Sequence, residues 1–191
     1  MSEKRKLLRH AIVRILTTEK DGAFPTDAET RVFANRPTPL WSSELPAICV
    51  YIKSEPAEKT VTAPVVYSRK PRIVVEALVA ATDECDDLLD AMQEQIENAL
   101  FANCYLMDPV DGVERLDEEL VLESTEMGLV QLGDGIVGSN SITFKAGFHT
   151  ESPELLYGDD LDDFNSANVK TDLNGDSEAE MENTVTVRRE P

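Results

Sequence analysis

The chain has 191 residues and a formal net charge of −19. This length accommodates one domain with a hydrophobic core and an additional segment. Such an acidic composition argues against binding nucleic acid by phosphate neutralisation, which needs clustered Lys and Arg. Solubility through self-repulsion explains the charge, and an acidic surface that lies near DNA without adhering to it is the alternative.

The three cysteines, Cys49, Cys85 and Cys104, lack metal-ligand spacing and favour a reduced, cytoplasmic setting. The N-terminus does not read as a signal peptide, and no apolar run approaches the roughly 18 residues of a membrane span. We therefore expect a soluble protein that is made in the cytoplasm.

Residues 4–18 have the periodicity of an amphipathic helix. Four basic residues crowd into this segment, mostly outside its apolar stripe: Lys4, Lys6, Arg9 and Arg14. They form the only basic patch that the sequence reveals. Two interpretations stay open: a solvated helix face, or an electrostatic contact with an acidic neighbour such as a second copy of the chain.

Residues 19–46 are rich in loop-forming residues, with a short strand expected at Arg31–Asn35. Trp41 lies in this polar stretch, either as a cap over the core or as an anchor for a partner. A strand follows at Leu45–Ile52. Ala57–Pro71 is expected to form a hairpin arm or a long loop.

The segment Arg72–Ala80 is apolar on both faces except at Glu76, which is typical of a central strand. A helix follows at Asp83–Asn103, with acidic residues in its first turn. Carboxylates there favour helix capping over a metal or acid–base site. Its expected apolar stripe consists of Leu88, Leu89, Met92, Ile96, Ala99 and Leu100.

Short strands are expected at Leu120–Leu122 and Gly128–Leu132, and a longer one at Ser141–Phe148. In the last, apolar residues alternate with polar ones, as in a sheet with one covered face. The order of elements predicts an α+β fold in which a mostly antiparallel or mixed sheet is packed by two amphipathic helices.

Residues 151–191 hold twelve acidic and three basic side chains, so we expect a domain at 1–150 and an extended acidic C-terminal arm at 151–191. Two pieces of the arm, around Val169 and Val185, have strand composition. We expect them to order only by adding to the sheet edge of a neighbouring subunit. An apolar group at residues 155–164 is expected to dock on the domain.

Three motifs resemble functional sites without their required context. Gly133–Gly138 matches G-x-G-x-x-G, but a strand and not a helix is expected after it, which excludes a dinucleotide site; we expect Gly133, Gly135 and Gly138 in a loop between two strands. Asp172–Asp176 resembles the start of a calcium loop with a misplaced glycine. His10 and His149 lack a nucleophile elbow. We assign no catalytic, cofactor-binding or metal-binding residue.

This layout resembles the tail terminator proteins of long-tailed bacteriophages, the group similar to minor tail protein U. The segments that carry the resemblance are the helix at residues 4–18, the strand Pro46–Tyr51, the strand Pro71–Glu76 with the acid-headed helix up to Leu100, the segment Leu120–Thr125 and the strand Ile142–Phe144. They are structural patterns and contain no catalytic signature.

The resemblance implies a virion protein that forms a homo-hexameric ring on the tail tube. Such a ring stops polymerisation of the tail tube protein and presents a face to the head–tail connector, while DNA passes through without specific binding. No enzyme activity, cofactor or membrane is implied. Candidate contacts between subunits or with partners are Lys4, Lys6, Arg9, Arg14, Trp41, Val169 and Val185.

Two other hypotheses stay open. An acidic DNA mimic that inhibits a host DNA-binding protein would explain the charge of −19. A head–tail stopper, the neighbouring connector component, shares the structural role of the terminator. The mimic should be a monomer or dimer that binds a basic protein, whereas the terminator should form sixfold rings.

Overall fold

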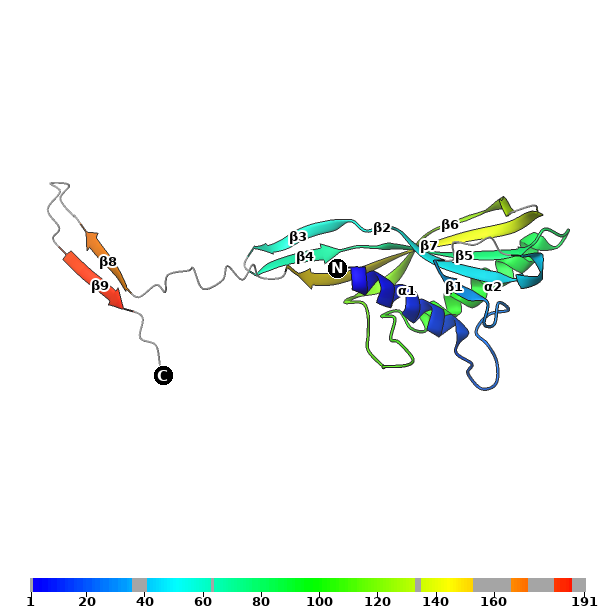
Figure 1. Cartoon of the computed structure of the whole chain (residues 1–191), viewed down its shortest axis with the longest axis horizontal. Coiled ribbons are helices and arrows are strands. Elements are labelled where there is room, and N and C mark those ends of the chain that lie inside the picture. The colour runs from blue at the N-terminus through cyan, green and yellow to red at the C-terminus, as the bar shows by residue number, and fades with distance from the viewer. Residues whose placement is uncertain are drawn as a thin grey trace. The chain divides into compact units, whose positions relative to one another are not determined.

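The computed structural model describes residues 2–35, 41–62, 64–132, 135–152, 166–171 and 181–186. The chain divides into two compact units, Met1–Ser152 and Pro153–Pro191, close to the boundary expected from the change in charge density. The first has the α+β fold that the sequence predicts, with helices on a mostly antiparallel sheet (Figure 1).

One long hairpin forms half of this sheet. Its strands are β2 (Ala47–Ser54), β3 (Ala57–Thr62), β4 (Val65–Arg69) and β5 (Arg72–Ala80). β2 pairs antiparallel with β5, and β3 with β4, so β3 and β4 continue the same hairpin as an arm. Figure 1 shows this arm extending past the helices. The hairpin interpretation of this segment is confirmed, and the long-loop alternative is wrong.

β7 (Gly135–Glu151) pairs with β5 and β4 along one side and with β6 (Glu118–Leu132) along the other. The sheet is completed by β1 (Val32–Ala34), which lies parallel to β2. The prediction of two short strands between residues 120 and 132 is wrong, because β6 is one strand of 15 residues. It accommodates two register shifts near its start and then pairs with β7 as far as Leu132.

Helices α1 (Ser2–Thr17) and α2 (Cys85–Phe101) cover one face of the sheet (Figure 1). Every second residue of β7 points into the core beneath them, which confirms the predicted alternation: Ile142, Phe144, Ala146 and Phe148 are buried. The same core contains Val75 and Val79 of β5 together with Leu89, Met92 and Ile96 of α2. Burial of these apolar side chains is the main stabilising term of the domain.

The predicted stripe of α2 is correct except at its first position. Leu89, Met92, Ile96 and Leu100 are buried, whereas Leu88 is exposed. Asp86 and Asp87 occupy the first turn, where negative charge complements the helix dipole. Glu84 at the N-cap makes no side-chain capping hydrogen bond, so the predicted capping by a carboxylate is not seen at that position.

The glycine-rich segment leads into a strand, as expected, and not into a helix. Gly133 lies outside the described residues, but Gly135 and Gly138 belong to β7 and not to a loop, so that part of the prediction is wrong. At Gly138, an added Cβ would lie 3.1 Å from Val79 Cγ2 and 3.2 Å from Leu89 Cδ1. The glycine therefore permits close packing of α2 on the sheet.

In the second unit, β8 (Ser166–Thr171) and β9 (Met181–Thr186) pair with each other in an antiparallel hairpin. This corrects the expectation that these pieces order only on a neighbouring subunit. The apolar group at residues 155–164 and the calcium-like segment at 172–176 lie outside the described residues.

The core position of α2 can be tested with Ile96→Asp, which places an unpaired charge at a fully buried site. We expect the free energy of unfolding to fall by more than about 3 kcal/mol, since a buried charge without a partner is poorly tolerated. Chemical denaturation measures the change. The control Asp90→Ala, at an exposed position of α2, should stay within about 0.5 kcal/mol of the parent. Equal stability of both variants would contradict this helix placement.

Candidate functional site

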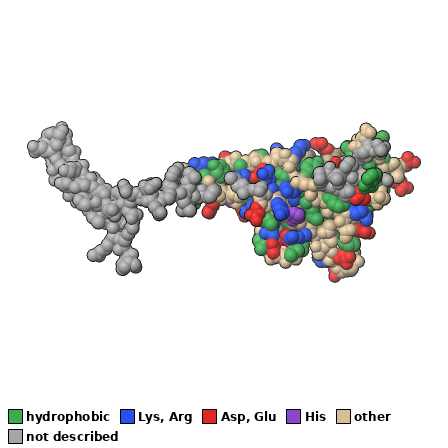
Figure 2. Space-filling model, viewed as in Figure 1, with side chains coloured by type: hydrophobic (Ala, Val, Ile, Leu, Met, Phe, Trp, Pro, Cys, Tyr) green, Lys and Arg blue, Asp and Glu red, His purple; other side chains and the backbone are tan. Residues whose placement is uncertain are grey.

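Two of the four predicted contact residues on α1, Lys4 and Arg14, make contacts within the domain. Lys4 Nζ lies 5.2 Å from the ring centroid of Phe148, a cation–π contact. Arg14 Nη1 lies 2.5 Å from Asp108 Oδ2. Figure 2 shows Lys and Arg side chains over α1 with acidic side chains among them. These internal contacts weaken the interpretation of α1 as a docking patch for an acidic neighbour.

Lys6 and Arg9 differ from the other two basic residues. Lys6 is exposed and has no ion-pair partner among the described residues. Arg9 is half-buried, and its Nε atom is buried without a hydrogen-bond acceptor in the described part of the chain. Burial, together with the charge of Arg5 one turn earlier, lowers the pKa of Arg9. Of the four predicted contact residues on α1, Lys6 is the exposed one for which no internal contact is described above.

Asp108 lies in the loop before β6 and binds Arg14, so it connects α1 to this loop. It is fully buried and receives hydrogen bonds from Arg14 at 2.5 Å, from Arg115 at 3.4 Å and from the Val110 amide at 2.9 Å. Burial alone would raise the pKa of Asp108, but the hydrogen bonds from Arg14 and Val110 and the charge of Arg14 outweigh burial and lower it. The carboxylate is therefore a structural anion.

Trp41 precedes the short 3₁₀ helix η1 (Ser42–Glu44), and its backbone amide donates to Glu44 Oε2 at 2.8 Å. Its side chain is 75% exposed. The interpretation of Trp41 as a cap over the core is therefore wrong. An exposed indole of this size is available to a partner, so the anchor interpretation stays a prediction.

A second group of basic residues was not predicted from the sequence. On the sheet face away from the helices, Arg72 of β5 is in register with Lys145 of β7 and donates two hydrogen bonds to Glu123 at 2.7 and 2.8 Å. The pKa of Glu123 is lowered, first by Arg72 and then by the charges of Lys145 and Lys53. These residues come from separate strands, so only the strand order brings them together.

β6 has the longest unpaired strand edge of the described domain. It pairs with β7 along one side, and among the described residues no strand pairs with its other side. Four of its apolar side chains are more than one-third exposed: Val121, Met127, Leu129 and Val130. Ile136 of β7, at the adjacent hairpin end, is 62% exposed. An open edge next to exposed apolar side chains is typical of a surface that a protein partner covers.

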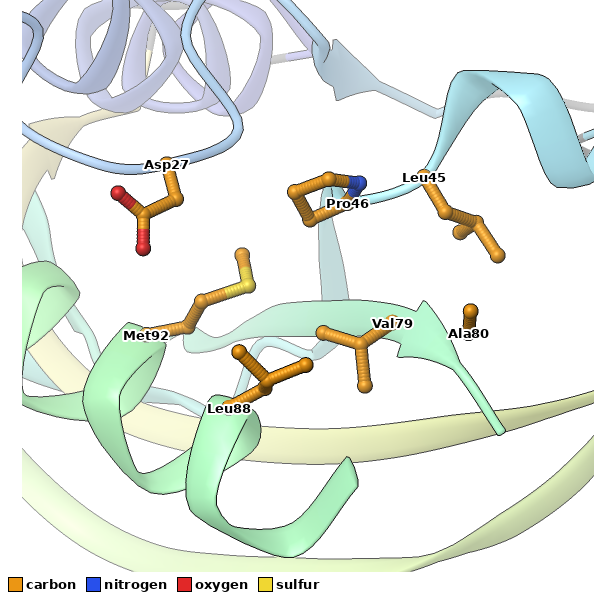
Figure 3. Close-up of a pocket in the computed structure, with 7 residues that line it drawn as sticks. All are labelled: Asp27, Leu45, Pro46, Val79, Ala80, Leu88 and Met92. Carbon is orange, nitrogen blue, oxygen red and sulfur yellow. The ribbon is translucent and has the colours of Figure 1, made fainter. Parts of the chain in front are cut away.

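A small pocket lies between α2 and the segment that leads into β2 (Figure 3). Its volume is about 210 Å³, and its lining is apolar apart from Asp27: Leu45, Pro46, Val79, Ala80, Leu88 and Met92. Asp27 is already bound to Gln95, whose Nε2 donates to Asp27 Oδ2 at 3.0 Å. The pocket can accept an apolar side chain, but its lining does not bring together the polar groups that orient a small ligand.

Within the residues that the structure describes, no cluster of three or more His, Cys, Asp or Glu side chains could hold a metal ion. His149 Nδ1 lies 3.1 Å from Asp117 Oδ2 in an exposed pair at the end of the sheet. Among the described helices, none is both long and apolar enough to span a membrane. No protein-family model matches the chain, and comparison with curated proteins gives no match.

The structural role of Asp108 can be tested with Asp108→Asn. Because its pKa is lower in the folded state, its ionisation stabilises the fold above the unfolded-state pKa of about 3.9 and ceases to do so as the pH falls through the folded-state value. Near neutral pH we expect the variant to lose about 1–3 kcal/mol of unfolding free energy, because the buried side chain at 108 loses its charge-assisted hydrogen bonds while water solvates the partly exposed Arg14. Denaturation over a pH series measures this loss.

The difference between Asp108→Asn and the parent should begin to shrink below about pH 4, where the unfolded parent chain takes up a proton at Asp108, and should be lost only as the pH falls through the lower pKa of the folded carboxylate. Asp90→Asn, at an exposed position of α2, serves as the control and should have little effect at any pH. A difference between Asp108→Asn and the parent that persists unchanged at low pH would contradict the ion-pair account.

Proposed function

We propose that this chain is a non-enzymatic structural protein of a phage virion, a tail terminator that forms a hexameric ring at the end of the tail tube. In this role it stops addition of the tail tube protein and provides the surface on which the head–tail connector docks. The observation that carries the proposal is the open edge of β6, 15 residues long, in an α+β domain of the expected layout.

An edge of this length requires a partner or a protective device. Proteins protect exposed edges with charged side chains, above all Lys, and with Pro, bulges or short strands. β6 contains neither Lys nor Pro, its register shifts are confined to residues 118–124, and it has no charged residue after Glu126. Residues 123–131 are all exposed. This pattern supports assembly with other protein chains as the normal state of the domain.

The charge of the chain also supports a role around DNA. A net charge of −19 disfavours binding of phosphate groups, so DNA can move past such a protein without being retained. On α1, Arg5 and Arg14 are paired with carboxylates of the same chain, which reduces the positive charge that this helix offers to DNA.

The proposal predicts that the purified protein adds a sixfold ring to one end of tail tubes of the phage that encodes it. Negative-stain electron microscopy shows the ring, and tube length measured after addition of tube protein shows whether growth stops. Tubes that remain bare and continue to lengthen would refute the terminator role. A ring on the connector side that never touches tubes would instead identify a stopper, and capture of a basic host protein by a monomer would identify a DNA mimic.

A matched pair of variants tests the role of β6 in ring formation. Leu129→Asp places a charge on the open edge strand at a residue that is 65% exposed, whereas Val110→Asp changes a loop residue that is 74% exposed. Both variants should fold, since neither side chain belongs to the core. We expect Leu129→Asp to abolish rings and Val110→Asp to retain them, as judged by counting capped tubes. Equal capping by both would remove β6 from the interface.

A further inference from the structure

We propose that the outer edge of β3 in one copy pairs with the outer edge of β6 in the next copy, so that the copies join head to tail through a continuous sheet. The inference rests on the ring assembly proposed above and identifies the two surfaces that form its subunit interface. It concerns contacts between identical chains and is independent of what the ring caps.

The two open edges lie on opposite sides of one sheet. Across the sheet from β6, the strands follow as β7, β4 and β3. β3 pairs with β4 on its inner side, and no described strand pairs with its outer side. A contact between two different surfaces repeats from copy to copy, and it closes into a ring when the rotation between copies allows. Pairing of two identical β6 edges would instead stop at a dimer.

Charge disfavours the pairing of two β6 edges. β6 has four acidic residues and no basic one: Glu118, Glu119, Glu123 and Glu126. Like charges that face each other across paired strands are destabilising. β3 is balanced, with Glu58 next to Lys59, and therefore meets β6 with less repulsion. The remaining edge strand, β1, has only three residues and offers a much shorter edge.

The two edges also match in length and exposure. All six residues of β3 are exposed, and Val61 is 43% exposed. Six residues span roughly 20 Å at the usual rise of a strand, which fits within the exposed run 123–131 of β6. Pairing would satisfy backbone N–H and C=O groups on both edges and would shield exposed apolar side chains of both strands, including Val61 of β3 and Leu129 of β6, from water.

The arm that carries β3 is braced at its base. Glu55, between β2 and β3, lies 2.6 Å from Arg69 Nη1 and 3.3 Å from Arg5 Nε of α1. Arg69 Nε donates to Thr150 Oγ1 of β7 at 2.8 Å, and the Lys70 amide donates to the Pro56 carbonyl at 2.9 Å. A strand that is held in place before association loses less conformational entropy when it binds.

Cysteine cross-linking between copies tests this pairing. Lys59→Cys on β3 and Glu126→Cys on β6 change exposed residues and should leave the fold intact. The two variants are purified separately, mixed with tail tubes and treated with a flexible bismaleimide. We expect a covalent dimer in the mixture and not with either variant alone. A chain that carries both changes should give a ladder of products up to the closed ring.

The parent, with native Cys49, Cys85 and Cys104, sets the background, and a mixture of Glu126→Cys with Asp90→Cys on α2 controls for random encounters. Dimers of Glu126→Cys alone or of Lys59→Cys alone would overturn the head-to-tail pairing, as would background levels in the mixture. If capped tubes form without the cross-link, the edge assignment fails and the terminator proposal stands. If the cross-link forms on rings that leave tubes uncapped, the edge assignment stands and the terminator proposal fails.

Discussion

The domain depends on β7, because this strand is paired along both of its sides. β5 and β4 follow one after the other along one side of β7, and β6 occupies the opposite side. On the helix side, Ile142, Phe144 and Phe148 anchor the core beneath α1 and α2. With β7 in this position, β6 must form one edge of the sheet, and the arm of β3 and β4 must extend on the other. The location of the open edges therefore follows from the same pairing that builds the core.

Elements with a strong periodic signal were predictable from the sequence. β5 has the predicted bounds Arg72–Ala80, and α2 lies within the predicted segment with four of its stripe residues buried. The length of β6 was missed because residues 123–131 are all exposed, so no alternation of buried apolar and exposed polar side chains marks this part of the strand. That β6 is an edge could not be predicted at all. Edge position depends on strand order, and strand order is set by contacts between segments far apart in the chain.

The candidate site, too, could be predicted only in part, because its charges are paired by contacts between distant segments of the chain. The sequence correctly identifies basic residues that lie mostly outside the apolar stripe, but the partner of Arg14 is 94 positions away, in a loop with no distinctive pattern. Conversely, Lys53, Arg72 and Lys145 look unrelated in the sequence, yet they all act on the pKa of Glu123 across adjacent strands. A basic side chain can bind a partner only if it is not already paired within the fold. Lys6 has no ion-pair partner among the described residues, whereas Arg14 is bound to Asp108.

An acidic subunit that assembles with copies of itself must rely on forces other than charge. At a net charge of −19, each copy repels the next, and β6 has no basic residue that could attract an acidic neighbour. Backbone hydrogen bonds between strand edges and contacts between exposed apolar side chains do not depend on net charge. Salt screens repulsion between surface charges over about 8 Å at physiological ionic strength, so added salt should strengthen such an interface and weaken one built on complementary charges. The open edges of β3 and β6 could provide backbone hydrogen bonds and apolar contacts of this kind, so the assembly proposed above is compatible with the acidity of this chain.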